Sequence, residues 1–226
     1  MITNIPLWVE IVFVLTSLFT VILFFILNGR PGRLLVFILL YGSLQSVLAY
    51  AGFYQIEGFP PRSIFILIPT FLFIIYGLTG KRLAWVMNSR NLKYSYFLHV
   101  IRIPVEIVLF QLYVAGSIPL LMTFEGRNFD IGIGIIAPLI GFLFLRNRIG
   151  LKSMIIWNSV GLAFVLFIVG NAVLSIEAPF QLFAFDQPNE AINYFPFVLL
   201  PSVIVPIVIY THLSDIILLK RRIKEG

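Results

Sequence analysis

The sequence has no cysteine, few charged residues and only two histidines. Without a thiol, the chain cannot form disulfides, thiolate metal sites, iron–sulfur clusters or a cysteine nucleophile. Only 12% of the residues are charged, whereas a soluble domain has about 25%, and 60% are hydrophobic. Mean hydropathy is +1.01. This balance predicts a membrane protein whose main partner is the lipid bilayer.

Further absences argue against several functional classes. The two histidines, His99 and His212, are too few for di-iron oxygenases and for zinc hydrolases of the seven-helix ceramidase type. The last apolar segment has no lysine before Lys220 to hold a retinal. Nucleic-acid binding is not expected, because the basic residues behind the net charge of +6 lie where anionic lipid headgroups attract them. No motif identifies an enzyme.

Seven apolar segments are each long enough to form a membrane-spanning helix. They cover residues 7–27, 34–53, 63–79, 94–122, 129–145, 154–176 and 194–219. The first does not resemble a cleaved signal peptide, because MITNIPLWVE has no basic residue. The predicted fold is therefore an all-α membrane protein with seven transmembrane helices, in a single domain over residues 1–226.

Basic residues gather in alternate loops between these segments and at the C-terminus. They are Arg30, Arg33, Lys81, Arg82, Arg90, Lys93, Arg146, Arg148, Lys152, Lys220, Arg221, Arg222 and Lys224. The other loops carry acids, among them Glu57, Glu125, Asp130, Asp186 and Glu190. By the positive-inside rule, the C-terminus is cytoplasmic and the N-terminus lies outside. We expect a multi-pass protein of the cell membrane, such as the bacterial inner membrane, with anionic lipid headgroups at its cytoplasmic face.

The fourth segment carries charges in an otherwise apolar run. His99, Arg102, Glu106 and Tyr113 lie on one narrow stripe of this helix. Because a charge that faces lipid costs several kcal/mol, about 3 or more, the stripe must face protein or water. Arg102 and Glu106 are spaced to pair along the helix, and Pro104 between them predicts a kink.

The seventh segment provides expected partners for this stripe. It carries Tyr210, His212 and Asp215. Counted from the nearest basic boundary, His212 and His99 lie at about the same depth, and Asn158 on the sixth segment can reach them. Asp215, one turn after His212, is expected to orient the imidazole or to pair with Arg102.

Several functions agree with such a cluster. Transport or sensing of a small anionic solute or a proton needs buried charges of this kind. A structural or assembly subunit would use the same residues only to fix helix packing, with a second copy or another membrane subunit as partner. His99 and His212 could hold a haem, and His99, Glu106, His212 and Asp215 a divalent metal. No cofactor is predicted.

Two segments between the spans combine aromatic residues with acids, Asn and Pro. They are LMTFEGRNFD at 121–130 and APFQLFAFDQPNEAINYFPF at 178–197. The longer one is expected to lie in the membrane interface as an aromatic belt, or to fold over the helices as a lid. With the fourth span, these segments resemble an uncharacterised family of bacterial seven-helix membrane proteins. The resemblance covers most of the chain and implies no activity.

Overall fold

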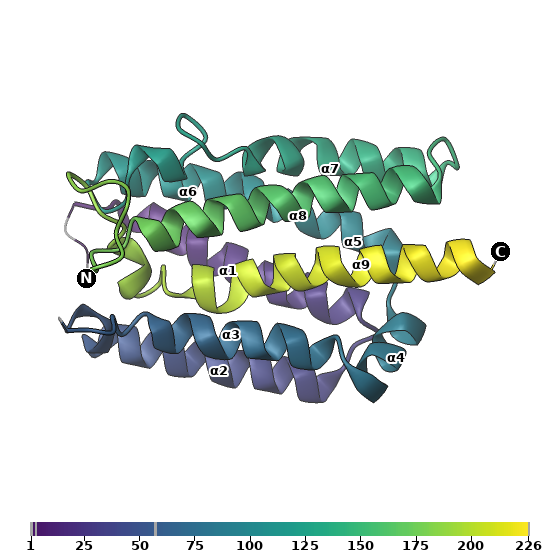
Figure 1. Cartoon of the computed structure of the whole chain (residues 1–226), viewed down its shortest axis with the longest axis horizontal. Coiled ribbons are helices and arrows are strands. Elements are labelled where there is room, and N and C mark those ends of the chain that lie inside the picture. Colours follow the sequence, from purple (N-terminus) through teal and green to yellow (C-terminus); the bar gives the residue numbers. More distant parts are fainter. Residues whose placement is uncertain (1, 3, 57, 226) are drawn as a thin grey trace.

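The computed structural model describes residues 2, 4–56 and 58–225, so Glu57 lies outside the described part of the chain. Within it, the protein is all-helical and has no β-strand. The long helices run side by side, and the loops gather at the two ends (Figure 1). The α-helices are α1 (Leu7–Leu27), α2 (Gly32–Tyr50), α3 (Ile64–Gly77), α4 (Gly80–Ser89), α5 (Leu92–Leu98), α6 (Arg102–Val114), α7 (Asp130–Leu145), α8 (Leu151–Leu174) and α9 (Val205–Glu225).

Long apolar helices indicate a membrane protein, as predicted. Five segments are long and apolar enough to cross a membrane: α1, α2, Leu92–Val114, α8 and Leu200–Glu225. A sixth is present if α3 and α4, bent by 72°, count as one span. The 16-residue α7 is apolar but shorter. Each of the seven predicted segments overlaps at least one of these helices.

Prolines explain where the helices depart from the predicted spans. A 3₁₀ turn, His99–Ile101, separates α5 from α6 just before Pro104, which has no N–H to donate to the preceding turn. The segment predicted at 194–219 becomes helical only at Leu200, in a π-helical turn, Leu200–Ile204, that contains Pro201 and leads into α9. Such turns are frequent at functional sites. The sequence prediction contained no counterpart of α4.

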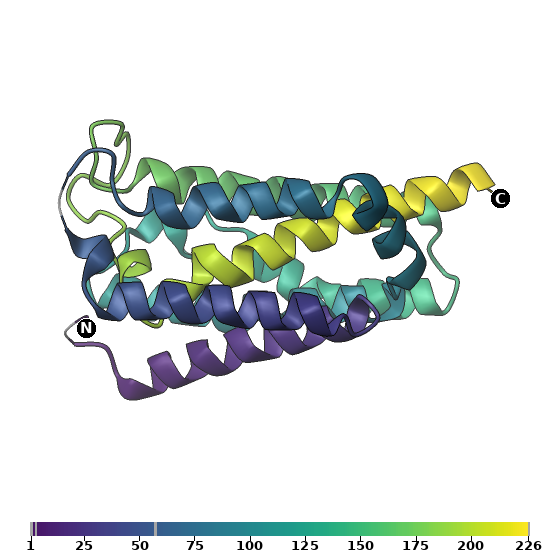
Figure 2. The same ribbon diagram turned by 90° about the horizontal axis from the view of Figure 1, so that it is seen from below.

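Helix α9 occupies the middle of the bundle. It packs along α8, and Figure 2 shows it running obliquely between α3 and α8 on one side and α1 and α2 on the other. Helices α2 and α3 form one edge, where the Tyr41 hydroxyl donates to the Ile66 carbonyl oxygen at 3.2 Å. The buried side of α9 therefore faces most of the other spans, so any group on it is shielded from lipid.

The segment at 178–197 folds over one end of the bundle. The Gln187 amide nitrogen donates to the carbonyl oxygens of Tyr113 at 3.0 Å and Ile118 at 2.6 Å. The backbone N–H groups of Glu190 and Ala191 both donate to the Ser117 carbonyl oxygen. These bonds attach the segment to the C-terminal end of α6 and to the loop that follows it.

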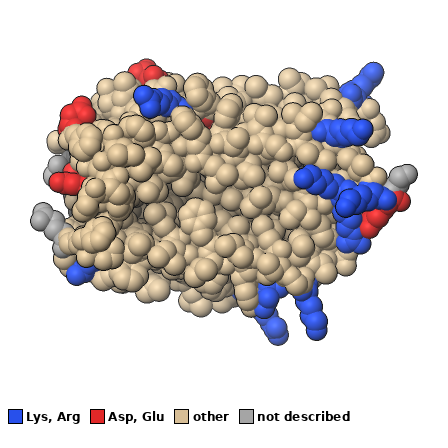
Figure 3. All heavy atoms as spheres, in the orientation of Figure 1, with Lys and Arg blue, Asp and Glu red and all other residues tan. Residues whose placement is uncertain are grey.

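Charged side chains divide between the two ends of the bundle. Lys and Arg gather at the end that carries the C-terminus, and Asp and Glu lie mainly at the opposite end (Figure 3). A broad surface without charge separates them on this face.

Candidate functional site

Arg102, at the start of α6, joins three helices in the interior. Its Nη1 donates to the Asp130 carboxylate on α7 at 2.6 Å. Its Nη2 donates to the Gly161 carbonyl oxygen on α8 at 3.3 Å and lies 2.8 Å from His212 Nε2 on α9. A guanidinium only donates, so His212 Nε2 must accept. The Nδ1–H of His212 then donates to Asn158 Oδ1 at 2.9 Å, which fixes the tautomer of a neutral imidazole.

Gly161 allows α8 to approach this arrangement closely. A Cβ atom at this position would lie 2.5 Å from His212 Cε1 and 2.7 Å from His212 Nε2. Any side chain would displace the imidazole. Because Gly161 has no side chain, His212 has room to form its hydrogen bond with Arg102.

The two histidines are in direct contact. The rings of His99 and His212 stack with centroids 4.0 Å apart and planes 9° from parallel. A bis-histidine haem needs an imidazole on each side of its iron, so rings stacked on each other do not fit that group. The four expected metal ligands do not converge, and no group of three or more His, Asp or Glu among the described residues could hold a metal ion.

Glu106 lies one turn beyond Arg102 and is also buried. Its Oε1 accepts a hydrogen bond from the Asn128 amide, and Asn128 Oδ1 accepts from the backbone N–H of Asp130 at 3.1 Å. Asn128 therefore connects Glu106 to the residue that pairs with Arg102. Within the described chain, Glu106 Oε2 and Arg102 Nε have no hydrogen-bond partner.

A cavity of about 70 Å³ lies beside these atoms. Arg102, Glu106, Asn128 and Asp130 form its polar side. The other side is apolar and comes from α8, the π-helical turn and α9, with Val165, Ile168, Leu200, Ile204 and Val208. A space of this size exceeds the roughly 10–15 Å³ that one water needs. It can hold several waters or one small ion.

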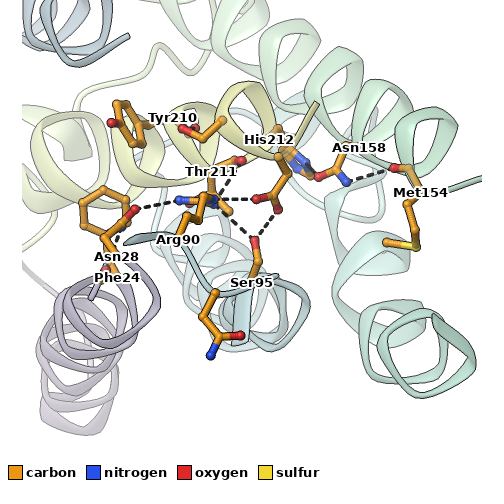
Figure 4. A network of polar contacts seen from close by, with 12 residues as sticks. Phe24, Asn28, Arg90, Ser95, Met154, Asn158, Tyr210, Thr211 and His212 are labelled. Atoms are coloured by element: carbon orange, nitrogen blue, oxygen red, sulfur yellow. Dashed lines mark hydrogen bonds and ion pairs between the residues drawn. The ribbon is translucent and has the colours of Figure 1, made fainter. Parts of the chain in front are cut away.

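A second buried ion pair lies towards the C-terminal end of the bundle. Arg90, between α4 and α5, places its Nε 2.5 Å from the Asp215 carboxylate on α9, and both side chains are fully buried. The guanidinium also donates to Asn28 Oδ1 at 3.0 Å, Ser95 Oγ at 3.2 Å and the Thr211 carbonyl oxygen at 3.2 Å, as Figure 4 shows. Asp215 accepts a further bond from Ser95. We call Arg90, Asp215, Asn28 and Ser95 the inner clasp.

The structure brings together His99, Arg102, His212 and Asn158, as the sequence analysis expected. Two of the expected pairings are not the ones found in the structure. Among the described residues Arg102 forms its ion pair with Asp130 and not with Glu106. Asp215 neither orients His212 nor pairs with Arg102, because its carboxylate forms an ion pair with Arg90.

Two other predicted members lie apart from the cluster. The Tyr210 hydroxyl points towards α3 and donates to the Gly77 carbonyl oxygen at 3.3 Å. Tyr113 is half-buried near the C-terminal end of α6, where its carbonyl oxygen accepts a hydrogen bond from Gln187. Both therefore contribute to packing between segments.

Sequence reasoning missed the loop-derived members of the site. It placed Asp130 on the acidic face, at the start of the span at 129–145, and Arg90 among the basic residues of the alternate loops, whereas both are buried. One signal was present for Asp130: the predicted span at 129–145 is short, which indicates that its polar N-terminal end begins below the membrane surface. No comparable signal marked Arg90.

Comparison with known proteins places the chain in a family. A family profile described as Domain of unknown function (DUF8737) matches residues 59–220, which include α3 to α8 and most of α9. Neither the curated proteins nor the solved structures gave a match. The profile match covers well over half of the sequence and includes Arg90, Arg102, Glu106, Asp130 and His212. The chain therefore belongs to the family described as Domain of unknown function (DUF8737).

Proposed function

We propose that this protein binds a small anion together with a proton at Arg102 and Glu106, and that it transports or senses that solute in a cell membrane. One observation carries the proposal. Arg102 Nε and Glu106 Oε2 are buried, lack a protein partner among the described residues, and belong to side chains that line the same cavity. Buried polar groups almost always have a partner, so two free ones beside one space favour an occupant.

The charges around the cavity favour the binding of a proton with the anion. Arg102 contributes one positive charge and Asp130 one negative charge. If Glu106 is ionised, an anion would bring the site to a net charge of −2 in a region of low dielectric, which is strongly unfavourable. If Glu106 is protonated, the anion meets only the pair and a hydroxyl donor. Glu106 would therefore take up a proton when the anion binds.

A purely structural role is favoured for the inner clasp but not for the cavity. The ionised groups of Arg90 and Asp215 have protein partners, and the pair joins α9 to the ends of α1 and α5. Such a satisfied network needs no ligand. The cavity differs because its donor and acceptor atoms remain free, so the two clusters have different roles.

The proposed topology has seven spans: α1, α2, α3, α5 with α6, α7, α8 and α9, with α4 on the cytoplasmic surface. The N-terminus lies outside and the C-terminus inside. The separation of basic and acidic side chains in Figure 3 supports this orientation. In a bacterial host the membrane would be the inner membrane.

Purified protein in liposomes that contain a pH-sensitive dye tests the function. We would impose inward gradients of chloride, nitrate or phosphate and measure internal acidification. Thermal unfolding with the same anions tests binding without transport. At least one anion should acidify wild-type vesicles or raise the unfolding midpoint. Glu106→Gln is neutral like the protonated acid, so it should abolish the acidification but keep the effect of the anion on the unfolding midpoint, and Glu125→Gln, at an exposed loop position, should retain both responses.

Arg102→Lys is a second variant to test in the same two experiments. Lysine keeps the positive charge but has no equivalent of the buried Nε–H that lacks a partner among the described residues, so this variant should respond at least tenfold more weakly. If folded wild-type protein gives neither response with any of the three anions, or if Glu106→Gln acidifies the vesicles as strongly as the wild type, the proposal is wrong.

A further inference from the structure

A larger cavity, of about 310 Å³, lies between α2, α3, α4 and α9. Its volume is at the lower end of the range typical of ligand sites, about 300–1,000 Å³. Phe37, Phe73, Ile74 and Ile207 are among its lining residues, and its wall is almost wholly apolar. It does not include Arg102 or Glu106, so it is separate from the site proposed above.

The polar groups in this wall already have partners. The Tyr41 hydroxyl donates to the Ile66 carbonyl oxygen at 3.2 Å, and the Tyr210 hydroxyl donates to the Gly77 carbonyl oxygen at 3.3 Å. The Ser202 hydroxyl donates to the Val198 carbonyl oxygen at 2.7 Å. A polar ligand would gain few hydrogen bonds here, whereas an apolar chain would lose none. The inner part of the cavity therefore suits a hydrocarbon chain.

Arg82 and Trp85 of α4 contribute to one end of the cavity. Helix α4 is turned by 72° from α3 and lies beside the ends of α2 and α3 nearest the C-terminal end of the bundle (Figure 1). The Arg82 guanidinium lies 3.4 Å from the centroid of the Tyr76 ring and also bonds to the Tyr76 hydroxyl. A basic residue with Trp and Tyr neighbours is typical of protein at the level of lipid headgroups.

The charge at this end favours an anionic headgroup. Lys81 and Arg82 are adjacent and exposed, and α4 has no acidic residue in its sequence GKRLAWVMNS. Two positive charges exceed the single charge of a phosphodiester. A phospholipid whose phosphate carries an uncharged or anionic substituent should therefore bind better than one whose ammonium group would approach these cations.

We propose that this cavity holds an acyl chain of an anionic phospholipid, and that Arg82 binds the phosphate of its headgroup. The lipid would fill the space between the α2–α3 edge and α9. Trp85 would lie at the level of the glycerol backbone. This site depends on residues different from those of the anion site, so either proposal can fail alone.

Native mass spectrometry of protein released from nanodiscs tests the proposal. The nanodiscs would contain equal amounts of phosphatidylglycerol and phosphatidylcholine with the same acyl chains. Wild-type protein should retain one phosphatidylglycerol, in at least tenfold preference over phosphatidylcholine. Arg82→Gln should reduce this retention at least tenfold. Arg146→Gln removes an equal charge from a residue that also lies over an aromatic ring, that of Phe142 at 5.3 Å, and should keep it.

A cavity-filling variant tests the acyl chain separately from the headgroup. Ile38, a half-buried residue of the cavity wall, would be changed to Trp. Ile38→Trp should lose the bound lipid although Arg82 is intact, and its thermal unfolding reports whether it is folded. Equal retention of the two lipids by wild-type protein, or equal effects of Arg82→Gln and Arg146→Gln, would overturn the proposal.

Discussion

Neutralising one member of the inner clasp should destabilise the protein strongly. Arg90→Gln would remove the ion pair with Asp215 and leave a fully buried carboxylate with Ser95 as its remaining side-chain partner. Breaking a buried pair by removing one partner costs about 3–5 kcal/mol. Asp215→Asn should cost a similar amount, because it leaves the guanidinium charge uncompensated.

The double variant distinguishes an ion pair from two separate contributions. Arg90→Gln with Asp215→Asn buries no charge, and both amides can still form hydrogen bonds. We expect it to be no less stable than either single variant, which corresponds to a coupling energy of at least about 3 kcal/mol. Arg221→Gln is the control. Its pair with Glu225 is at 2.6 Å, but the two side chains are 48% and 58% exposed, so it should cost less than about 1 kcal/mol.

Thermal unfolding in detergent, followed by tryptophan fluorescence, measures these differences. For a chain of this size 1 kcal/mol corresponds to about 2–4 °C in Tm. Each single clasp variant should therefore unfold about 6–20 °C below the wild type. Additive losses in the double variant, or a single loss no larger than that of Arg221→Gln, would refute the reasoning.

Two further predictions concern helix packing and orientation. Gly161→Ala should cost about 1–3 kcal/mol in unfolding free energy, because its Cβ would lie 2.5 Å from His212 Cε1. Gly170→Ala on the same helix, with nothing within 4 Å, should be neutral or stabilising by up to about 1 kcal/mol in the same assay, and equal losses would contradict the packing argument. For orientation, the chain has no cysteine, so Asp186→Cys should react with a membrane-impermeant maleimide on intact cells. Lys152→Cys should react only after lysis; the reverse pattern would invert the proposed topology.

The sequence predicted the helical segments well because the bilayer constrains them strongly. A span needs about 20 apolar residues, and that requirement is visible without any knowledge of packing. Residue counting from the basic boundaries also placed His99 and His212 at one depth, and their rings stack in the structure. Both inferences depend only on helix rise and hydropathy.

The ion pairs could not be predicted in the same way. Arg90 lies in a predicted loop and Asp130 at the very start of a predicted span, and only contacts formed in three dimensions turn such residues into the interior. Arg90 follows α4, whose turn from α3 is not visible in composition. The pairing of Arg102 with Glu106 followed from helix spacing, but Asp130 and Asn128 offered closer partners from another element.

In the proposed topology, in which α7 crosses the membrane, this short helix would couple the site to the thickness of the bilayer. Its 16 residues extend about 24 Å, compared with about 30 Å of hydrocarbon in a typical bilayer. The bilayer beside the exposed Ile135, Leu139 and Phe142 would therefore become locally thinner, or α7 would shift along the membrane normal, to reduce the difference between helix length and hydrocarbon thickness. Its first residue, Asp130, is the ion-pair partner of Arg102. A thicker bilayer would thus exert a force on this ion pair, and the geometry of the cavity beside it would depend on bilayer thickness.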